Sequence, residues 1–276
     1  MEKDFKYSVL MSIYIKENPD YFKKSLDSML NQTIKPDEVI LVEDGPLTSE
    51  LYAVIEEYKK SNPDCIKTVV NETNLGLGLA LRKGLEHCKN ELVARMDTDD
   101  IAISTRCEKQ LVFLNEHPDV DIVGGQIEEF IGNENNIVGK RIVPCSDQSL
   151  KEYTKKRCPF NHMTVMFRKK AVQNAGGYMD LHFNEDYYLW IRMAKNNSVF
   201  ANLEETLVHV RVDENMYQRR GGFKYFKSEK ALQDMMLQSN MISLSRYVVN
   251  TGARLVLQVM MPNKLRGFVF RTLARK

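Results

Sequence analysis

Three aspartates stand close together at the end of an apolar segment of the chain. The segment ARMDTDD at 94–100 offers carboxylates at Asp97, Asp99 and Asp100. Alternate residues at a strand end can converge on one point, and Mg²⁺ or Mn²⁺ is usually held by one or two carboxylates together with phosphate oxygens. Such a metal would neutralise charge on a departing diphosphate. A solvated acidic turn, or the DxD motif that begins one class of phosphatase site, remains an alternative at this point.

A second acidic pair lies in VEDG at 42–45. A carboxylate of Glu43 or Asp44 could accept hydrogen bonds from a nucleobase, and Gly45 permits a tight turn. Taken alone, an acidic loop on a turn explains this motif better.

A glycine-rich segment, ETNLGLGLALRKG at 72–84, predicts the start of a helix that Asn74 would cap. Backbone N–H groups at a helix start favour anions. Arg82, one to two turns further on, could reach a base or a phosphate. The ordinary alternative is a glycine-tolerant surface helix.

A third acidic pair opens the amphipathic segment NEDYYLWIRM, which follows a Gly-Gly turn. Acids are favoured in a first helical turn, so Glu185 and Asp186 could be no more than good capping residues. As a functional alternative, one of these carboxylates would take a proton from a hydroxyl as a general base.

These motifs must be positioned by the alternating strands and helices that the first hundred residues predict. We expect strands at 7–15, 37–44, 66–70 and 91–97, with helices at 19–31, 48–60 and 75–88 between them. Asn18 can cap the first helix, where Pro19 suits the first position. This alternation predicts a parallel, doubly wound α/β sheet, which binds ligands beyond the carboxyl ends of its strands.

The pattern changes after residue 104. The expected elements are a helix at 104–116, strands at 120–131 and 136–144, a helix at 146–157, a strand at 163–169, a helix at 185–196, an extended segment at 205–212 and mainly helix from 217.

Seven basic residues and no acid follow Asp234. In 243–276 apolar residues recur at helical spacing, and Pro262 divides the segment into two helices. A basic amphipathic helix can lie in a membrane interface, whereas a helix packed on the domain or a nucleic-acid site is the alternative.

Composition places the chain among ordinary folded proteins. Its 276 residues suit one large domain or one domain with a tail, and 43% hydrophobic and 28% charged residues argue against disorder. The five scattered cysteines argue against a disulfide framework and favour a reducing compartment. The apolar run near the N-terminus ends at Lys16, so we expect a first strand and not a signal peptide. No segment reaches the roughly 18 apolar residues of a membrane span.

Taken in order, the motifs closely resemble those of the family 2 glycosyltransferases, which have the GT-A fold. The resemblance covers roughly residues 7–215 and rests on SVLMSIYI, VEDG, ETNLGLGLALRKGL, ARMDTDD and GGY followed by NEDYYLWIRM. It implies a GT-A domain at 1–215, with a mainly parallel central sheet covered by helices on both faces. A basic helical extension at 216–276 would follow. The relatives it suggests are bacterial enzymes that build capsule, exopolysaccharide or O-antigen.

The resemblance implies an inverting transfer of a sugar from a nucleotide-sugar donor, expected to be a UDP-hexose or UDP-N-acetylhexosamine, to a glycan or lipid-linked acceptor. On the donor side, the resemblance implies nucleotide contact for Tyr14 and Glu17, base contact for Glu43 or Asp44, and donor contact for Asn74 and Arg82. It implies ribose or sugar contact for Asp97, and binding of Mn²⁺ or Mg²⁺ by Asp99 with Asp97. At the reacting centre it implies donor or acceptor contact for His162, acceptor or sugar contact for Glu185, and the role of catalytic base for Asp186. The family often has Asp in place of Glu43 and Asn in place of Arg82.

Four other basic residues have weaker claims. His209 lies where some GT-A enzymes place a metal ligand, although a structural role is the better interpretation. Arg211 and the pair Arg219–Arg220 are candidates for a loop over the diphosphate, with a solvated basic loop as the alternative.

The expected location is cytoplasmic, with peripheral association at the inner face of the cell membrane through 243–276. We expect no nucleic-acid partner, because the acidic strand ends would repel phosphate and no nucleic-acid module is recognisable. A DxD phosphatase is disfavoured because three strand–helix units precede Asp97. A donor-binding subunit without turnover is a further alternative.

Overall fold

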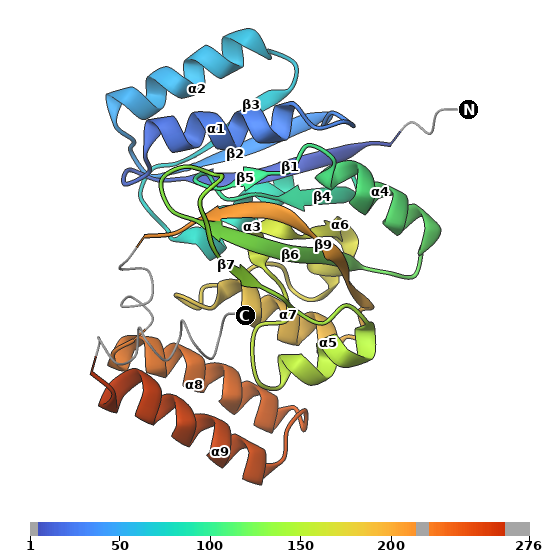
Figure 1. Ribbon diagram of the computed structural model, residues 1–276, viewed down its shortest axis with the longest axis vertical. Helices are drawn as coiled ribbons and strands as arrows, with labels where there is room; N and C mark the ends of the chain where they lie inside the picture. The colour runs from blue at the N-terminus through green and yellow to red at the C-terminus, as the bar shows by residue number, and fades with distance from the viewer. Residues whose placement is uncertain (1–4, 214–220, 263–276) are drawn as a thin grey trace.

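A nine-stranded mixed sheet lies at the centre of the molecule (Figure 1). The computed structural model describes residues 5–213 and 221–262. The strands are β1 Tyr7–Ile13, β2 Glu38–Asp44, β3 Ile66–Asn71, β4 Leu92–Arg95, β5 Ile101–Ala102, β6 Ile122–Phe130, β7 Ile137–Arg141, β8 Met166–Arg168 and β9 Phe200–Arg211. Their order is β3-β2-β1-β4-β8-β6-β9-β5, with β7 paired to β6.

The first half of the sheet is parallel, as the strand–helix alternation predicts. Strand β1 pairs in parallel with β2 and β4, and β2 pairs in parallel with β3. The second half is mixed, because β8 runs antiparallel to both β4 and β6 while β6 and β9 are parallel. The carboxyl ends of β1, β2 and β4 therefore meet at one edge, where the first two acidic motifs lie: Glu43 and Asp44 end β2, and the aspartate loop follows β4.

Helices cover both faces of the sheet, which confirms the expected class. They are α1 Pro19–Leu30, α2 Ser49–Ser61, α3 Leu77–His87, α4 Arg106–Glu116, α5 Asp147–Thr154, η1 His162–Thr164, α6 Lys169–Asn174, α7 Glu185–Lys195, α8 Phe223–Gln238, α9 Leu244–Leu255 and η2 Val256–Met260. The short elements β5, η1 and α6 were not among the expected ones, and β9 begins five residues before the predicted start at 205.

Alternation along the strands divides the interior into two cores. Val9 and Met11 of β1 face one core with α1, α2 and α4, whereas Leu10 faces the other with α3, α6 and α7. This follows from the two-residue period of a strand, which sends successive side chains to opposite faces. Gly84 of α3 allows a close contact with the second face, because a Cβ there would lie 2.5 Å from Leu10 Cδ1 and 2.6 Å from Val42 Cγ2.

Two caps were predicted from the sequence, and the structure bears out one of them. Asn18 Oδ1 accepts hydrogen bonds from the N–H groups of Asp20 and Tyr21, so it caps α1. The prediction that Asn74 caps the third helix is wrong, because α3 begins at Leu77 with Gly76 as its N-cap residue.

The C-terminal helices α8 and α9 form a separate layer at the opposite end of the molecule from α1 and α2 (Figure 1). Tyr187 and Ile191 of α7 pack against Leu232 and Met236 of α8 in a third apolar cluster. Predicted helical structure after residue 217 is thus present in the described part, and the second helix expected after Pro262 lies outside it. Within the described residues, no helix is both long and apolar enough to cross a bilayer.

Candidate active site

The loop of the three aspartates leaves the sheet at the end of β4 and is held from two sides. Asp97 Oδ2 lies 2.5 Å from Nη1 of Arg95, whose side chain is 1% exposed. The Ser25 hydroxyl of α1 donates a hydrogen bond to the Asp97 carbonyl at 2.6 Å. The Asp97 side chain is 29% exposed, so it combines a fixed position with access to solvent.

Arg211, the last residue of β9, fixes the other end of this loop. Its main-chain N–H donates to Asp100 Oδ1 at 2.8 Å, and its Nε donates to the Asp99 carbonyl at 3.2 Å. The guanidinium carbon lies 3.7 Å from the ring centre of Tyr21 and 4.6 Å from that of Phe130. Arg211 therefore lies in a strand and holds the aspartate loop, so it belongs neither to a loop over the diphosphate nor to a solvated basic loop. The pair Arg219–Arg220 lies outside the described residues.

Negative charge accumulates where these elements meet. Burial, followed by the nearby Asp99 and Asp97, raises the pKa of Glu17 to about 7. Burial, followed by Asp97, raises the pKa of Asp99 to about 6, and burial raises the pKa of Asp100 well above its usual range. Carboxyl groups whose charges oppose one another in this way favour binding of a cation, and perturbed pKa values of this kind gather at functional sites.

The carboxylates Asp97 and Asp99 fit a divalent metal that arrives with a diphosphate. In the part of the chain that the structure describes, no three His, Cys, Asp or Glu side chains form a group able to hold a metal by themselves. Mg²⁺-type sites need only one or two carboxylates when phosphate supplies further oxygens, so two aspartates are compatible with such a site. His209 lies on β9 with Nδ1 3.9 Å from Glu128 Oε2, and its role as a metal ligand stays a prediction.

Asp44 organises the turn that leads into α3. Its Oδ1 accepts hydrogen bonds from Asn71 Nδ2 and from the Leu75 N–H, both at 2.9 Å, and its Oδ2 accepts from the Gly76 N–H at 2.9 Å. Asn74 Nδ2 donates to the Asp44 carbonyl at 3.1 Å. Both carboxylate oxygens of Asp44 are thus engaged by the chain itself.

The remaining expected donor residues differ in exposure. Glu43 is 6% exposed, and burial raises the pKa of its carboxyl. Tyr14, after β1, is 38% exposed. Arg82 is exposed on α3. Burial lowers the pKa of Arg192 on α7, and the charge of Arg82 lowers it further. Arg82 is therefore near enough to α7 for its charge to act on Arg192.

A glycine brings the start of α3 against the start of α7. A Cβ at Gly78 would lie 2.8 Å from the Met179 carbonyl oxygen and 3.0 Å from Glu185 Cβ. Only a residue without a side chain leaves room for this approach. The anion-favouring helix start and the third acidic pair are consequently adjacent.

The acidic pair itself is largely enclosed. Burial, followed by the charge of Asp186, raises the pKa of Glu185 to about 7. Burial also raises the pKa of Asp186, whose Oδ1 accepts from the Tyr187 N–H at 2.6 Å and whose Oδ2 accepts from Cys158 Sγ at 3.5 Å. A carboxyl group with a raised pKa is suited to take a proton from a hydroxyl at neutral pH.

His162 belongs to a buried group beside the same site. Its Nε2 lies 2.9 Å from the Tyr178 hydroxyl, and its side chain is 9% exposed. Burial, followed by the charge of Arg95, holds the pKa of His162 well below its usual range, so the imidazole is neutral. Its contact with donor or acceptor stays a prediction.

Sequence reasoning missed Arg95, Tyr178 and Cys158. The charge of Arg95 lowers the pKa of five carboxyl groups in this region, those of Glu17, Asp99, Asp100, Glu185 and Asp186. The signal was available, because an arginine two residues before Asp97 in an apolar strand shares its side of the chain. Nothing in the local sequence of Cys158 indicated its contact with Asp186.

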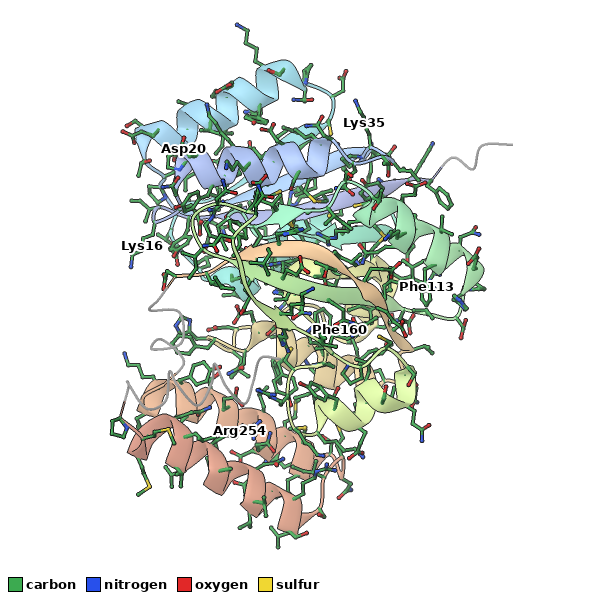
Figure 2. The ribbon with its side chains drawn as sticks, in the orientation of Figure 1. Lys16, Asp20, Lys35, Phe113, Phe160 and Arg254 are labelled. Atoms are coloured by element: carbon green, nitrogen blue, oxygen red, sulfur yellow. The ribbon has the colours of Figure 1, made fainter. Side chains whose placement is uncertain are left out.

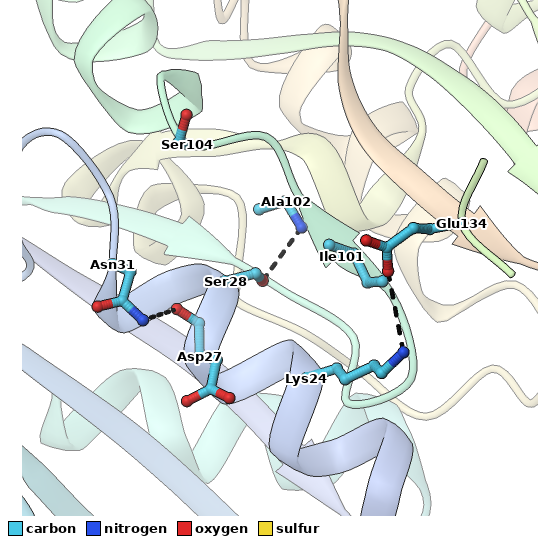
Figure 3. Close-up of a pocket in the computed structure, with 8 residues that line it drawn as sticks. All are labelled: Lys24, Asp27, Ser28, Asn31, Ile101, Ala102, Ser104 and Glu134. Atoms are coloured by element: carbon cyan, nitrogen blue, oxygen red, sulfur yellow. Dashed lines mark hydrogen bonds and ion pairs between the residues drawn. The ribbon is translucent and has the colours of Figure 1, made fainter.

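A cavity of about 400 Å³ lies apart from these carboxylates, between α1 and β5 (Figure 3). Asp27, Ser28 and Asn31 line it from α1, and an ion pair of 3.9 Å between Lys24 and Glu134 lies beside it. None of the predicted site residues lines this cavity, so we assign it no part in the chemistry.

The mostly parallel sheet with helices on both faces is the GT-A fold. A model of the family described as Glycosyl transferase family 2 matches residues 8–174, more than half of the chain. The chain therefore belongs to glycosyltransferase family 2, and it is a glycosyltransferase.

Relatives of similar length carry names of the same kind. The chain is 44% identical to an "Uncharacterized glycosyltransferase" of Haemophilus influenzae, over 98% of this chain and 100% of the relative. It is 38% identical to the "UDP-Gal:alpha-D-GlcNAc-diphosphoundecaprenol beta-1,3-galactosyltransferase" of Escherichia coli, over 98% and 97%. It is also 38% identical to the "Amylovoran biosynthesis glycosyltransferase AmsE" of Erwinia amylovora, over 96% and 97%.

Solved structures confirm the fold. S. aureus TarS 1–349 in complex with UDP-GlcNAc matches with a TM-score of 0.67 at 17% identity, over 97% of this chain and 76% of that one. The mannosyltransferase PcManGT from Pyrobaculum calidifontis, in complex with GDP-Man and Mn²⁺, matches with a TM-score of 0.64 at 15% identity, over 95% and 72%.

Proposed function

We propose that this chain transfers a hexose or N-acetylhexosamine from its UDP derivative to a lipid-linked acceptor during synthesis of a bacterial surface polysaccharide, with inversion at the anomeric carbon. The observation that carries this proposal is that Glu185 lies beside the start of α3 and that the charges of both Asp186 and Asp97 act on its carboxyl group. The relative named for a UDP-Gal donor and a diphosphoundecaprenol acceptor matches almost the whole chain, which supports this donor and acceptor.

The proposed mechanism is a direct displacement. Asp186 takes the proton from the acceptor hydroxyl, and the hydroxyl oxygen attacks the anomeric carbon as the bond to UDP breaks. The N–H of Tyr187 and the thiol of Cys158 hold the two oxygens of Asp186 in place. We assign contact with the acceptor or the transferred sugar to Glu185, which lies beside the start of α3.

The donor side is assigned to the other acidic group. Mn²⁺ or Mg²⁺ held by Asp99 and Asp97, when bound, supplies positive charge to the leaving diphosphate. We assign contact with the nucleotide to Glu17 and Tyr14, which follow β1, and contact with the base to Glu43. The start of α3 faces the same region and offers main-chain N–H groups to an anion.

We propose the same division of the chain that the sequence indicates, with the transferase domain at 1–215 and the helical extension at 216–276. The lipid-linked acceptor favours a cytoplasmic protein that associates peripherally with the inner face of the cell membrane. The phosphatase alternative is superseded, since the chain belongs to a glycosyltransferase family.

Thermal stabilisation by nucleotides tests the donor half of this proposal. A ligand that binds only the folded protein raises the melting temperature by mass action. We expect UDP and one UDP-sugar to stabilise the protein in the presence of Mn²⁺, and GDP to have less effect. Asp99→Ala should abolish the metal-dependent part. Equal stabilisation with and without metal, or none by any nucleotide sugar, would contradict the assignment.

A further inference from the structure

Four polar side chains of helix α9 and its continuation η2 face the protein, namely Arg246, Asn250, Arg254 and Gln258. Arg254 Nε donates to Glu229 Oε2 at 2.6 Å, and Asn250 Nδ2 donates to Gln233 Oε1 at 2.9 Å, which joins α9 to α8. Figure 2 shows Arg254 in this layer. Gln258 of η2 is 5% exposed on the same side.

Two charged contacts also attach α9 to the α5 region. Arg246 Nη1 donates to Glu152 Oε1 at 2.7 Å, and Arg254 Nη2 donates to the Lys156 carbonyl at 2.7 Å. The two arginines of α9 are therefore paired with the protein. The basic face expected from the sequence does not point outwards on this helix.

The outward side is instead apolar. We call the following exposed residues the apolar stripe: Leu244 at 65%, Val248 at 59%, Val249 at 68%, Leu255 at 39%, Val256 at 49%, Val259 at 40% and Met260 at 70%. They recur at intervals of three, four and seven residues, which puts them along one side of the helix. Over 17 residues from Leu244 to Met260 the stripe is roughly 25 Å long. A row of large exposed apolar side chains marks a surface that a partner covers.

We propose that the apolar stripe of α9 and η2 lies in the headgroup–acyl boundary of an anionic lipid bilayer and holds the enzyme at its acceptor. Besides the two paired arginines, five basic residues and no acid follow η2 in the sequence, so this end of the chain is complementary to anionic lipid: Lys264, Arg266, Arg271, Arg275 and Lys276. A second copy of the chain would bring two such sets of positive charge together. A single apolar face along one helix suits insertion parallel to the membrane plane.

Packed helices connect the apolar stripe to the candidate base. Helix α8 lies between α9 and α7, and Leu232 of α8 packs against Tyr187, the residue after Asp186. A membrane contact through α9 therefore sets the position of the helix that carries the base. This part of the inference rests on the proposed function, because it requires a lipid-linked acceptor.

Vesicle flotation tests the stripe without catalysis. The test variant is the full chain with Leu244→Gln, Val248→Gln and Val249→Gln, and the control carries Val138→Gln and Ile142→Gln, which are 51% and 64% exposed outside the stripe. We expect the wild type and the control to float with vesicles containing anionic phosphatidylglycerol, and the test variant to partition at least tenfold less. Fluorescence of Trp190, which is 0% exposed, checks the fold.

Two results overturn the proposal. One is flotation of the folded test variant equal to that of the wild type. The other is a wild-type chain that forms a dimer, loses it in the test variant and does not float, which would make the stripe an interface between copies.

A transfer assay separates this inference from the proposed function. We expect the test variant to lose at least fivefold in transfer to a long-chain polyprenyl diphosphate acceptor in vesicles and to keep wild-type transfer to a short-chain, water-soluble acceptor. Equal losses on both acceptors would refute a membrane role in catalysis. If the wild type uses neither acceptor but its flotation still requires the stripe, the proposed function fails and the membrane surface stands.

Discussion

Removal of the Asp44 carboxylate is expected to release the turn that carries the start of α3. Asp44 is 3% exposed and accepts three hydrogen bonds of 2.9 Å, from Asn71, Leu75 and Gly76. A hydrogen bond to a charged group contributes roughly 1.5–3 kcal/mol, and such losses do not add fully. We therefore expect Asp44→Ala to lower the free energy of unfolding by about 3 kcal/mol.

Urea unfolding followed by fluorescence measures this loss, since Trp190 is the single tryptophan of the chain and is buried. Glu72→Ala is the matched control, because Glu72 is exposed on the same turn, and it should change stability by less than about 0.5 kcal/mol. Asp44→Asn retains one carbonyl oxygen and should fall between the two. If Asp44→Ala unfolds at the same urea concentration as Glu72→Ala, the turn does not depend on this carboxylate.

Three further substitutions test the acceptor side. The pKa of Glu185 is about 7 in the folded protein against an ordinary value of 4.5, so its ionisation lowers the stability of the fold increasingly as pH rises from about 4.5 to 7. Glu185→Gln should therefore raise the melting temperature at pH 8 and leave it nearly unchanged at pH 4.5. Equal shifts at the two pH values would contradict this. Cys158→Ala removes a donor to Asp186 worth about 1 kcal/mol, so kcat should fall about fivefold and Cys158→Ser should restore it; an unchanged kcat argues against the contact. Gly78→Val collides with the Met179 carbonyl and should cost about 1–3 kcal/mol in thermal unfolding together with most activity, whereas wild-type behaviour would refute the close packing.

The parallel half of the fold could be predicted because its signals are local. Successive residues of β1 such as Val9 and Leu10 are apolar, which indicates a strand buried on both faces, and turn residues separate each strand from the next helix. Placing the acidic motifs at strand ends then required only the parallel arrangement. Five motifs in order supplied the family, which no single motif could have done.

The details that could not be predicted depend on residues distant in sequence. Asn74 was expected to cap α3, but the carboxylate of Asp44, 31 and 32 residues away, takes the N–H groups of Leu75 and Gly76 and moves the helix start to Leu77. Local propensity contains no information about such a contact.

The orientation of α9 is a second example. Its spacing correctly predicts an amphipathic helix, but its charges were expected to face water or lipid. Arg246 and Arg254 instead face Glu152 and Glu229, which are 94 and 25 residues away. Which side of an amphipathic helix faces the protein is decided by these partners and not by the helix sequence.

The proton transfer assigned to Asp186 is the central claim, and single-turnover transfer from a radiolabelled UDP-sugar to a soluble diphosphate-linked acceptor tests it most directly. With Mn²⁺ and saturating donor, Asp186→Asn should slow transfer by about 10²–10⁴-fold, as expected for loss of a general base. Its dissociation constant for UDP should stay within twofold of the wild-type value, because Asp186 does not belong to the donor side. Transfer by Asp186→Asn at the wild-type rate would contradict the account and leave the base to be sought elsewhere in the site.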